Sequence, residues 1–299
     1  MTDRPVHLLV PYWGEPALLD ATLESVLAQD DPAWILTIVD DCYPDPAARE
    51  RWGDHPDARI TYFRNDANLG VAGNFERCRE LGVAGPAGRC VFLGSDDLLD
   101  TSYVRRMREL DSAHPTVAMI QAGARVIDAD GRPSTALADR VKARLTPSVG
   151  APTLLEGEDL AASLLTGNWL YWPALGFTTD ALSRVSFRED LPIILDLALI
   201  MDLVLQGEGI LLDPVVTFSY RRHDASASST SRFDRRFADE ARFHAEVAER
   251  LDALGWRRAR RAARLRATSR LHAAALLPGA VRERSWPQMR ELVRHAVTR

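Results

Sequence analysis

Lysine is almost absent from this sequence. Of the 37 lysine and arginine residues, Lys142 is the only lysine. Twelve arginines lie between residues 255 and 299 against two glutamates, although the whole chain has a formal charge of -5. Such an arginine bias can reflect a GC-rich genome, and neither a helix-turn-helix nor a zinc pattern accompanies it. We therefore expect no nucleic-acid partner.

Cysteines and long apolar runs are also scarce. The three cysteines, Cys42, Cys78 and Cys90, are odd in number and match neither a disulfide framework nor a zinc site. No run approaches the ~18 apolar residues of a membrane helix, since even residues 193–205 are interrupted by two aspartates. The start of the chain lacks the pattern of a signal peptide. We expect reduced thiols and a cytoplasmic protein.

The first 128 residues alternate short β-rich runs with longer helix-patterned segments, which predicts an α/β fold with a mainly parallel sheet. Residues 128–152 are polar and contain a turn signal at Gly131-Arg132-Pro133, so we expect an exposed loop or hairpin there. From residue 233 onward the pattern predicts helices with a break at Pro278-Gly279. The predicted strands are 7–13, 35–41, 59–65, 90–96, 117–127 and 209–220, and the predicted helices are 17–29, 46–52, 71–81, 102–114 and 193–206.

Polar residues follow the first four predicted strands at the points where they end. Open α/β sheets bind ligands beyond the carboxyl ends of their strands, so these side chains should line one rim. The aspartates among them are adjacent pairs, Asp40-Asp41 and Asp96-Asp97. The other polar residues at these strand ends are Glu15 and Asn68.

Asp96 and Asp97 are candidate metal ligands. Hard cations such as Mg2+ and Mn2+ take oxygen ligands and commonly bridge one or two carboxylates to a diphosphate. The alternative is an aspartate N-cap for the helix predicted from about residue 100. The second aspartate pair and the Asn68 to Gly70 turn favour the metal site, because several polar groups converging on one rim are hard to explain as caps.

With these motifs in order, the chain resembles a family 2 glycosyltransferase with the GT-A fold. The resemblance spans roughly residues 6 to 230, which is more specific than any single short motif. The matching segments are Val10-Pro11-Tyr12-Trp13-Gly14-Glu15-Pro16, Ile38-Val39-Asp40-Asp41-Cys42, Asn68-Leu69-Gly70-Val71-Ala72-Gly73-Asn74, Leu93-Gly94-Ser95-Asp96-Asp97-Leu98-Leu99, Leu195-Asp196 and Tyr220-Arg221-Arg222-His223.

The resemblance implies roles for individual residues. Asp97 would hold the metal with help from His223, Asp96 would lie near the ribose or the metal, and Asp196 would be the general base. Asp202 competes with Asp196 for that role, but the spacing to the Tyr220 segment favours Asp196. The nucleotide-sugar residues would be Pro11, Tyr12, Glu15 and Asp41 around the nucleoside, Asn68 and Gly70 in a turn against phosphate or ribose, and Asn74.

The implied reaction is a metal-dependent, inverting transfer of a sugar from a UDP-, dTDP- or GDP-linked donor to an acceptor hydroxyl. The acceptor would be a sugar, a lipid-linked molecule or a small molecule, in polysaccharide, glycolipid or glycosylated-metabolite biosynthesis. The implied division is a GT-A domain over 1–230, with a nucleotide-binding half over 1–128 and an acceptor-binding half over 129–230, and a helical extension over 231–299. The alternatives are a sugar nucleotidyltransferase and a non-catalytic binding module with the same fold.

Two further features each keep two interpretations. The aromatic residues Trp169, Tyr171 and Trp172 lie where such enzymes meet the acceptor, or they belong to the core. Arginines from Arg257 to Arg264 share one arc of a predicted helix. They form either a solvated face or a peripheral contact with anionic lipid at the inner face of the membrane.

The sequence also departs from the family pattern. Gly94 stands where many relatives carry the first aspartate of an Asp-x-Asp motif, which leaves Asp96 and Asp97 for the metal and ribose. Cys42 replaces the usual small residue after the second strand, and Leu195 replaces the usual glutamate before Asp196. These changes predict unusual base and sugar preferences.

Overall fold

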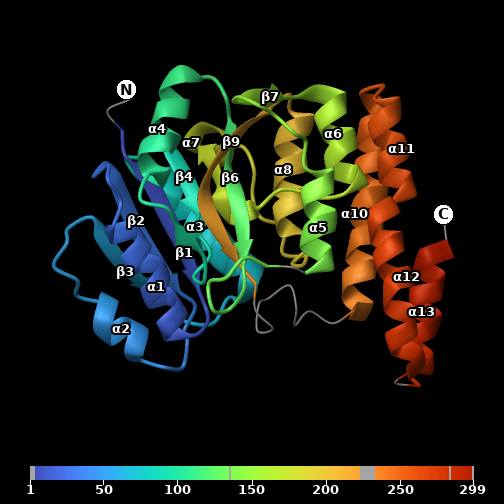
Figure 1. Cartoon of the computed structure of the whole chain (residues 1–299), viewed down its shortest axis with the longest axis horizontal. Coiled ribbons are helices and arrows are strands. Elements are labelled where there is room, and N and C mark those ends of the chain that lie inside the picture. Colours follow the sequence, from blue (N-terminus) through green and yellow to red (C-terminus); the bar gives the residue numbers. More distant parts are fainter. Residues whose placement is uncertain (1–3, 135, 223–232, 283, 298–299) are drawn as a thin grey trace.

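A single mixed sheet organises the protein (Figure 1). The computed structural model describes residues 4–134, 136–222, 233–282 and 284–297. The sheet has nine strands, of which eight follow the order β3-β2-β1-β4-β8-β6-β9-β5 and β7 pairs with β9. Helices cover both faces of this sheet, and the C-terminal helices stand beside it (Figure 1).

The first half of the sheet is parallel, as the alternating pattern predicts. β1 (Val6–Tyr12) lies between β2 (Trp34–Asp40) and β4 (Arg89–Phe92), and β3 (Ile60–Arg64) pairs with β2. Parallel neighbours need crossover connections. The crossovers contain α1 (Pro16–Leu27), α2 (Ala47–Trp52) and α3 (Gly70–Ala84).

The second half of the sheet mixes directions. β8 (Leu175–Thr178) runs antiparallel to both β4 and β6 (Met119–Ile127), while β9 (Ile210–Arg221) runs parallel to β6. The predicted strand over 90–96 ends at Phe92, because the next residues turn before β5 (Leu98–Leu99) pairs with β9. The remaining elements are α4 (Tyr103–Ala113), β7 (Thr153–Leu155), α6 (Gly157–Thr166), η1 (Trp172–Ala174), α7 (Thr179–Ser183) and α8 (Leu195–Leu205).

The polar segment 128–152 is only in part the loop or hairpin expected for it. Ile127 pairs with Pro133 in a short bridge, which fits a hairpin. The segment then forms a helix, α5 (Leu137–Leu145). The prediction missed α5 because its charged residues gave no continuous apolar face, although Leu145 packs against the core.

Alternate residues of the central strands face two apolar cores. In β1, Leu9 belongs to one core and Leu8 to the other, and in β4 Phe92 and Val91 divide in the same way. This is the period-two alternation of a strand buried on both faces. A rigid sheet between two cores fixes the strand ends that carry the candidate site.

In the described part of the chain, β9 is followed by the helices α10 (Phe233–Ala253), α11 (Arg257–Leu265), α12 (Ala267–Arg282) and α13 (Trp286–Val297). The predicted break at Pro278-Gly279 is wrong, because α12 continues through Pro278. A proline removes one helical hydrogen bond, and packing of Ala280 with Leu292 of α13 compensates for that loss. In the part of the chain that the structure describes, no helix combines the length and apolar character needed to cross a membrane. The domain boundary at residue 230 stays a prediction.

Candidate functional site

The carboxyl ends of β1, β2, β3 and β4 meet at one edge of the sheet, as predicted. Asp41 N donates to Tyr12 O at 3.1 Å, and Asn65 N donates to Asp40 O at 2.9 Å. A Cβ added to Gly14 would lie 3.9 Å from Ser95 Oγ, so the turn after β1 adjoins the turn after β4. We call this edge the rim.

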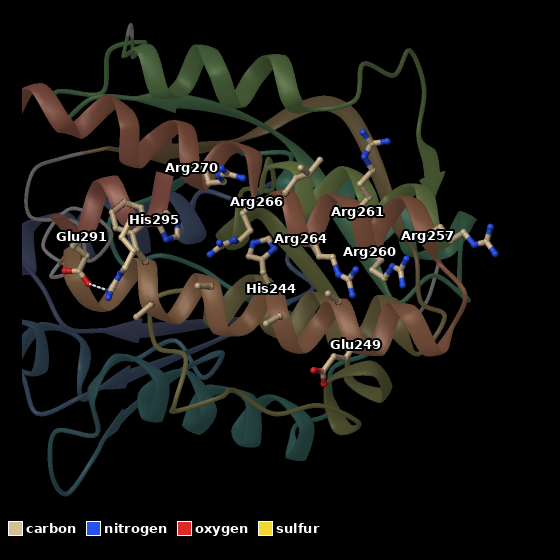
Figure 2. Close-up of a pocket in the computed structure, with 18 residues that line it drawn as sticks. His244, Glu249, Arg257, Arg260, Arg261, Arg264, Arg266, Arg270, Glu291 and His295 are labelled. Atoms are coloured by element: carbon tan, nitrogen blue, oxygen red, sulfur yellow. Dashed lines mark hydrogen bonds and ion pairs between the residues drawn. The ribbon is translucent and has the colours of Figure 1, made fainter. Parts of the chain in front are cut away.

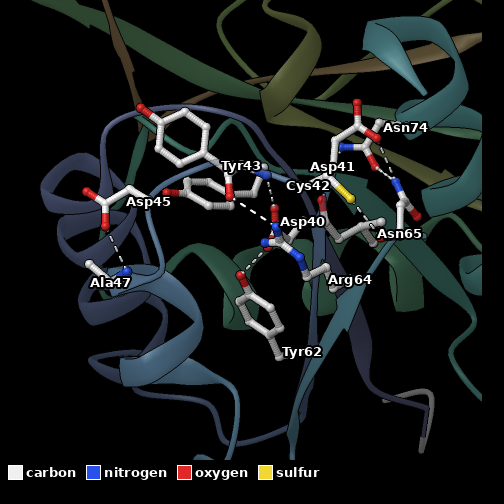
Figure 3. A network of polar contacts seen from close by, with 12 residues as sticks. Asp40, Asp41, Cys42, Tyr43, Asp45, Ala47, Tyr62, Arg64, Asn65 and Asn74 are labelled. Carbon is white, nitrogen blue, oxygen red and sulfur yellow. Dashed lines mark hydrogen bonds and ion pairs between the residues drawn. The ribbon is translucent and has the colours of Figure 1, made fainter. Parts of the chain in front are cut away.

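Asp40 and Asp41 at the end of β2 are almost completely buried, with exposed fractions of 1% and 2%. Figure 3 shows the polar contacts around them. Asp40 accepts hydrogen bonds from Tyr43 N at 2.8 Å and from the Tyr62 hydroxyl at 2.7 Å, and it forms an ion pair with Arg64. These contacts use both of its carboxylate oxygens. Asp40 therefore fixes the loop after β2 rather than offering a ligand site.

Asp41 holds the turn that follows β3. Its Oδ1 accepts from Asn65 Nδ2 and from Leu69 N, both at 2.8 Å, and its Oδ2 accepts from Gly70 N at 2.9 Å. Gly70 has a φ of +72°, a conformation that favours glycine. The geometry gives Asp41 a positioning role for the turn, and its predicted contact with a nucleoside stays a prediction.

Asn68 and Asn74 differ in what they offer to a ligand. Asn68 is exposed at the rim, and its Oδ1 accepts from Gly70 N at 2.9 Å. Asn74 is 3% exposed, accepts from Asn65 at 3.0 Å and donates to Val39 O at 3.1 Å (Figure 3). The amide of Asn74 holds Asn65 inside the protein, and the contact of Asn74 with the nucleotide sugar stays a prediction.

Aromatic rings surround the end of β1. Tyr12 is fully buried and donates to Gly14 O at 2.9 Å, and its ring lies 5.4 Å from that of Tyr43. Trp13 is half-exposed and meets the Tyr43 ring edge-on at 5.3 Å. The accessible aromatic surface is therefore that of Trp13 beside Tyr43. The remaining predicted residues here are Pro11, partly buried in β1, and Glu15, exposed before α1.

The turn that carries Asp96 and Asp97 holds a buried carboxylate oxygen, Oδ2 of Asp97, that has no hydrogen-bond partner. Asp97 is 1% exposed; its Oδ1 accepts from Arg221 N at 2.8 Å, whereas its buried Oδ2 has no hydrogen-bond partner. A Cβ added to Gly94 would collide with Asp97 Oδ2 and lie 3.0 Å from Asp96 Oδ1. Both carboxylates thus face the same small space, which only glycine at position 94 leaves open.

Electrostatics at this turn oppose an isolated negative charge. Burial raises the pKa of Asp97 well above its ordinary value, and the neighbouring Asp96 raises it further, while Arg221 lowers it. A buried anion without partners is costly, and a bound cation removes that cost. Arg221 also ties the turn to β9, since its Nε donates to Asp96 O at 2.8 Å.

The donor set fits a magnesium- or manganese-type cation. Such cations are usually held by one or two carboxylates plus waters and phosphate oxygens of a substrate. The described residues contain no cluster of three or more histidine, cysteine, aspartate or glutamate side chains suited to a metal. Among the predicted metal residues, Asp96 and Asp97 could hold such an ion. His223, the other predicted metal residue, lies outside the described residues.

Asp196 begins α8 and is partly buried. Asn168 Nδ2 donates to its Oδ2 at 3.2 Å. Burial raises the pKa of Asp196, while a backbone hydrogen bond at Leu197, the charge of Lys142 and the Asn168 contact lower it. The competing Asp202 instead forms an ion pair with Arg250 of α10. Asp196 forms no ion pair with an arginine in the described part of the chain, and its role as the general base stays a prediction.

The charges of the Asp96-Asp97 turn and of Asp196 both act on Tyr220. Burial raises the pKa of Tyr220 to about 12, followed in effect by the charges of Asp97, Asp96 and Asp196. The phenol therefore lies within electrostatic reach of the metal turn and of the candidate base.

Lys142 of α5 is a site residue that the sequence analysis missed. Its Nζ lies 4.0 Å from the ring centroid of Tyr171 and 5.9 Å from that of Tyr220. Burial lowers the pKa of Lys142 to about 8, against the attraction of Asp196. Its status as the only lysine in an arginine-rich chain was the available signal, because a compact ammonium was kept where arginine is the rule.

The predicted acceptor aromatics separate into two groups. Trp169 is 1% exposed and donates to Ser163 Oγ at 3.0 Å, and Trp172 stacks on Phe92 at 5.3 Å inside the core. Both indoles are packed in the core, and their acceptor role stays a prediction. Tyr171 lies beside Lys142 and Tyr220, so it is the candidate acceptor contact that the geometry favours.

Residues 8–150, which contain the whole rim, match the family model described as Glycosyl transferase family 2. The chain carries a family 2 glycosyltransferase domain. This domain includes both aspartate pairs and α5, whereas Asp196 follows it in the chain. No curated protein matches the sequence.

Solved structures show that the fold around the family 2 domain is of the GT-A type. TarS 1-349 from S. aureus, in complex with UDP-GlcNAc, is 15% identical with a TM-score of 0.64; the match covers 81% of this chain and 66% of TarS 1-349, just under two thirds. Mannosyltransferase PcManGT from Pyrobaculum calidifontis, in complex with GDP-Man and Mn2+, is 17% identical with a TM-score of 0.58; that match covers 99% of this chain and 87% of the other.

Proposed function

We propose that this protein transfers a sugar from a nucleoside-diphosphate sugar to an acceptor hydroxyl, with a divalent cation at Asp96 and Asp97. The observation that carries the proposal is the unsatisfied Oδ2 of Asp97, buried and facing Asp96 across Gly94. When bound there, Mg2+ or Mn2+ would offset the negative charge that develops on the departing diphosphate. The family 2 model and the rim geometry support the same donor class.

Asp196 is the proposed general base. An acceptor hydroxyl is a weak nucleophile, and a carboxylate that takes its proton during attack gives ordinary general-base catalysis. The hydroxyl oxygen bonds to the anomeric carbon, the bond from that carbon to the diphosphate oxygen breaks with its electron pair, and the proton passes to Asp196. Attack opposite the leaving group inverts the anomeric centre, as expected for the family.

The rim supplies the proposed donor contacts. Trp13 and Tyr43 offer an aromatic surface for the base, and the turn held by Asp41 carries Asn68 and Gly70 towards the ribose or phosphates. The relatives above were solved with UDP-GlcNAc and with GDP-Man, so we propose a UDP-, dTDP- or GDP-linked sugar. The proposed products belong to polysaccharide, glycolipid or glycosylated-metabolite biosynthesis.

Tyr171 is the proposed acceptor contact. Its ring is partly buried and packs at 5.5 Å from Tyr220, and Lys142 lies over it. Aromatic faces stack on sugar rings and on apolar groups alike. The acceptor would therefore lie between Tyr171 and Asp196.

The test compares Asp196→Asn with Asp202→Asn, two variants of α8 with the same change in charge. UDP-GlcNAc and GDP-mannose are each incubated with Mn2+ or with EDTA, and release of UDP or GDP is measured together with the melting temperature. We expect Mn2+-dependent release, lowered about 100-fold or more in Asp196→Asn. Asp202→Asn should stay within about threefold of the parent, because Asp202 already pairs with Arg250.

The thermal shift and the consumption of donor together distinguish the ways in which the proposal could fail. Asp196→Asn should keep the thermal shift given by UDP and Mn2+, because its effect falls on the acceptor proton and not on the donor. Equal loss in both α8 variants would exclude Asp196 as the base. If neither donor is consumed and UDP and GDP give no thermal shift with any metal, the transferase proposal fails in favour of a non-catalytic module.

A further inference from the structure

A second cavity lies among the C-terminal helices, away from the rim (Figure 2). Its volume is about 1090 Å³, and its lining comes entirely from residues between Phe237 and His295. Seven arginines line it against two glutamates, although the chain as a whole is acidic. We call this cavity the arginine cleft.

Helix α11 places part of this charge in a row. Arg257, Arg261 and Arg264 follow each other at spacings of four and three residues, which puts them on one helical face. The opposite face carries Ala259 and Ala263, which are 0% and 1% exposed. All three arginines line the cleft, as does Ala263 at its wall.

These three arginines have no partner of opposite charge among the described residues. Two other arginines of the lining do have one: Arg260 pairs with Asp252, and Arg294 pairs with Glu291 at 3.4 Å. Arg257, Arg261 and Arg264 are exposed and form no ion pair with any described residue. Like charges at these helical spacings repel each other, so the row is destabilising until an anion joins it.

The interior of the cleft shows the same positive field. His295 is 7% exposed, and its pKa is lowered by burial and then by the charge of Arg266. Burial lowers the pKa of His244 to about 4, so both histidines are neutral at pH 7. Alanines of α10 form the facing wall, and their small side chains leave the space open.

We propose that the arginine cleft binds a ligand that carries two or more phosphate groups. Guanidinium groups pair with phosphate through two parallel hydrogen bonds, and they lose less hydration than an ammonium does. Arg257 and Arg264 are about 10 Å apart along the helix axis at 1.5 Å per residue. A chain of phosphates or several neighbouring lipid headgroups can follow the length of this row and pair with each of its arginines.

The test uses two double variants with the same loss of charge. Arg261→Gln with Arg264→Gln changes the cleft, and Arg282→Gln with Arg290→Gln changes two exposed arginines that do not line it. Sodium tripolyphosphate is titrated into each full-length protein by calorimetry, with EDTA present so that the rim holds no cation. We expect the cleft pair to weaken binding at least tenfold and the control pair less than twofold.

Vesicles distinguish the two sources of phosphate. The same three proteins are floated with phosphatidylglycerol vesicles and with phosphatidylcholine vesicles. Binding to the anionic vesicles that is lost in the cleft pair and displaced by tripolyphosphate supports a lipid headgroup in the cleft. Binding of tripolyphosphate alone supports a soluble phosphorylated ligand.

Two results would overturn the proposal. One is an equal effect of the two double variants, which would mean attraction to the general surface charge. The other is binding of neither tripolyphosphate nor anionic vesicles by the parent protein. Misfolding is checked by melting temperature, which should not fall in the cleft pair because the substitutions remove like-charge repulsion.

Discussion

Two pairs of adjacent aspartates end two strands of the same sheet, yet the protein treats them in opposite ways. Asp40 and Asp41, after β2, accept between them six contacts from protein groups. Asp97, at the turn after β4, accepts one hydrogen bond from Arg221 and leaves Oδ2 buried without a partner. The sequence signal is the same at both places, whereas the hydrogen bonding is not.

This difference separates structural carboxylates from ligand-binding ones. A buried carboxylate that is fully hydrogen-bonded contributes to stability, and removing it leaves its donors unsatisfied. A buried carboxylate with an unused oxygen weakens the empty protein but is ready for a cation. The pair after β2 should therefore affect stability, and the pair after β4 should affect activity.

The largest expected effect follows from Asp97→Asn. The change removes a charge that the proposed cation requires, so we expect kcat/KM for donor consumption to fall about 10² to 10³-fold. The melting temperature in EDTA should not fall, because an uncharged amide of the same shape removes a poorly satisfied buried anion. Both are measured on one preparation, by nucleotide release and by thermal melt.

The melt in EDTA also serves as the control. A drop of several degrees in Asp97→Asn would mean that Asp97 is structural, like Asp41, and the contrast between the two pairs would be lost. Retention of Mn2+-dependent activity would remove Asp97 from the metal site.

The next effect concerns stability. Asp41→Ala leaves Leu69 N without an acceptor and removes one of the two acceptors of Gly70 N and of Asn65 Nδ2. We expect the free energy of unfolding to fall by about 2 to 4 kcal/mol, measured by urea denaturation. Asp45→Ala is the matched control, because the exposed Asp45 accepts a single hydrogen bond from Ala47 N, and it should cost about 1 kcal/mol or less. Equal losses in the two variants would contradict the structural role of Asp41.

Local pattern predicted the rim because strand alternation and strand ends are local properties. The parallel direction of the first four strands and the gathering of their carboxyl ends are confirmed, and their order is β3-β2-β1-β4. The distinction between the aspartate pairs was not predictable, because the partner of Asp97 is Arg221, far along the chain. The burial of Trp169 and Trp172 likewise depends on packing with Phe92 and its neighbours. The sequence analysis missed helix α5 because its charged residues form no continuous apolar face. The contact between Lys142 and Tyr171 depends on the folded structure and is not visible in the sequence.

The third carboxylate, Asp196, is intermediate between the two pairs in its hydrogen bonding, and its pKa depends on the charge of Lys142. Because the pKa of Lys142 is lowered to about 8, its ammonium is present at pH 7 and is lost as the pH rises through 8. Loss of that charge should raise the pKa of Asp196 and remove the electrostatic attraction between Lys142 and Asp196. Activity should therefore decline severalfold above pH 8. The charged and titratable groups that face this ammonium are Asp139, Tyr171, Asp196, Tyr220 and Arg222.

Two substitutions at position 142 test this pH dependence. Lys142→Arg keeps its charge at all these pH values, so the decline should move to higher pH. Lys142→Met should be less active at pH 7 and should lack the decline. The measurement is the rate of nucleotide release between pH 6 and 10, with thermal melts at each pH. An unchanged decline in both variants would assign it to another group.

The smallest effect concerns the residue that follows the satisfied pair. Cys42 has a φ of +62°, in the left-handed region, and its sulfur donates to Asn65 O at 2.9 Å. A left-handed residue with a Cβ costs about 1 to 2 kcal/mol, whereas glycine avoids that cost but loses about 0.5 to 1 kcal/mol through chain entropy. Cys42→Gly should therefore change the free energy of unfolding by about 1 kcal/mol or less, and Cys42→Val should lower it by about 1 to 2 kcal/mol, since a β-branched residue fits this conformation worst. Equal free energies of unfolding for Cys42→Val and Cys42→Gly in urea denaturation would mean that Asp40 and Asp41 do not hold the loop after β2 in this conformation. The contrast with the turn after β4 would then depend on Asp97 alone.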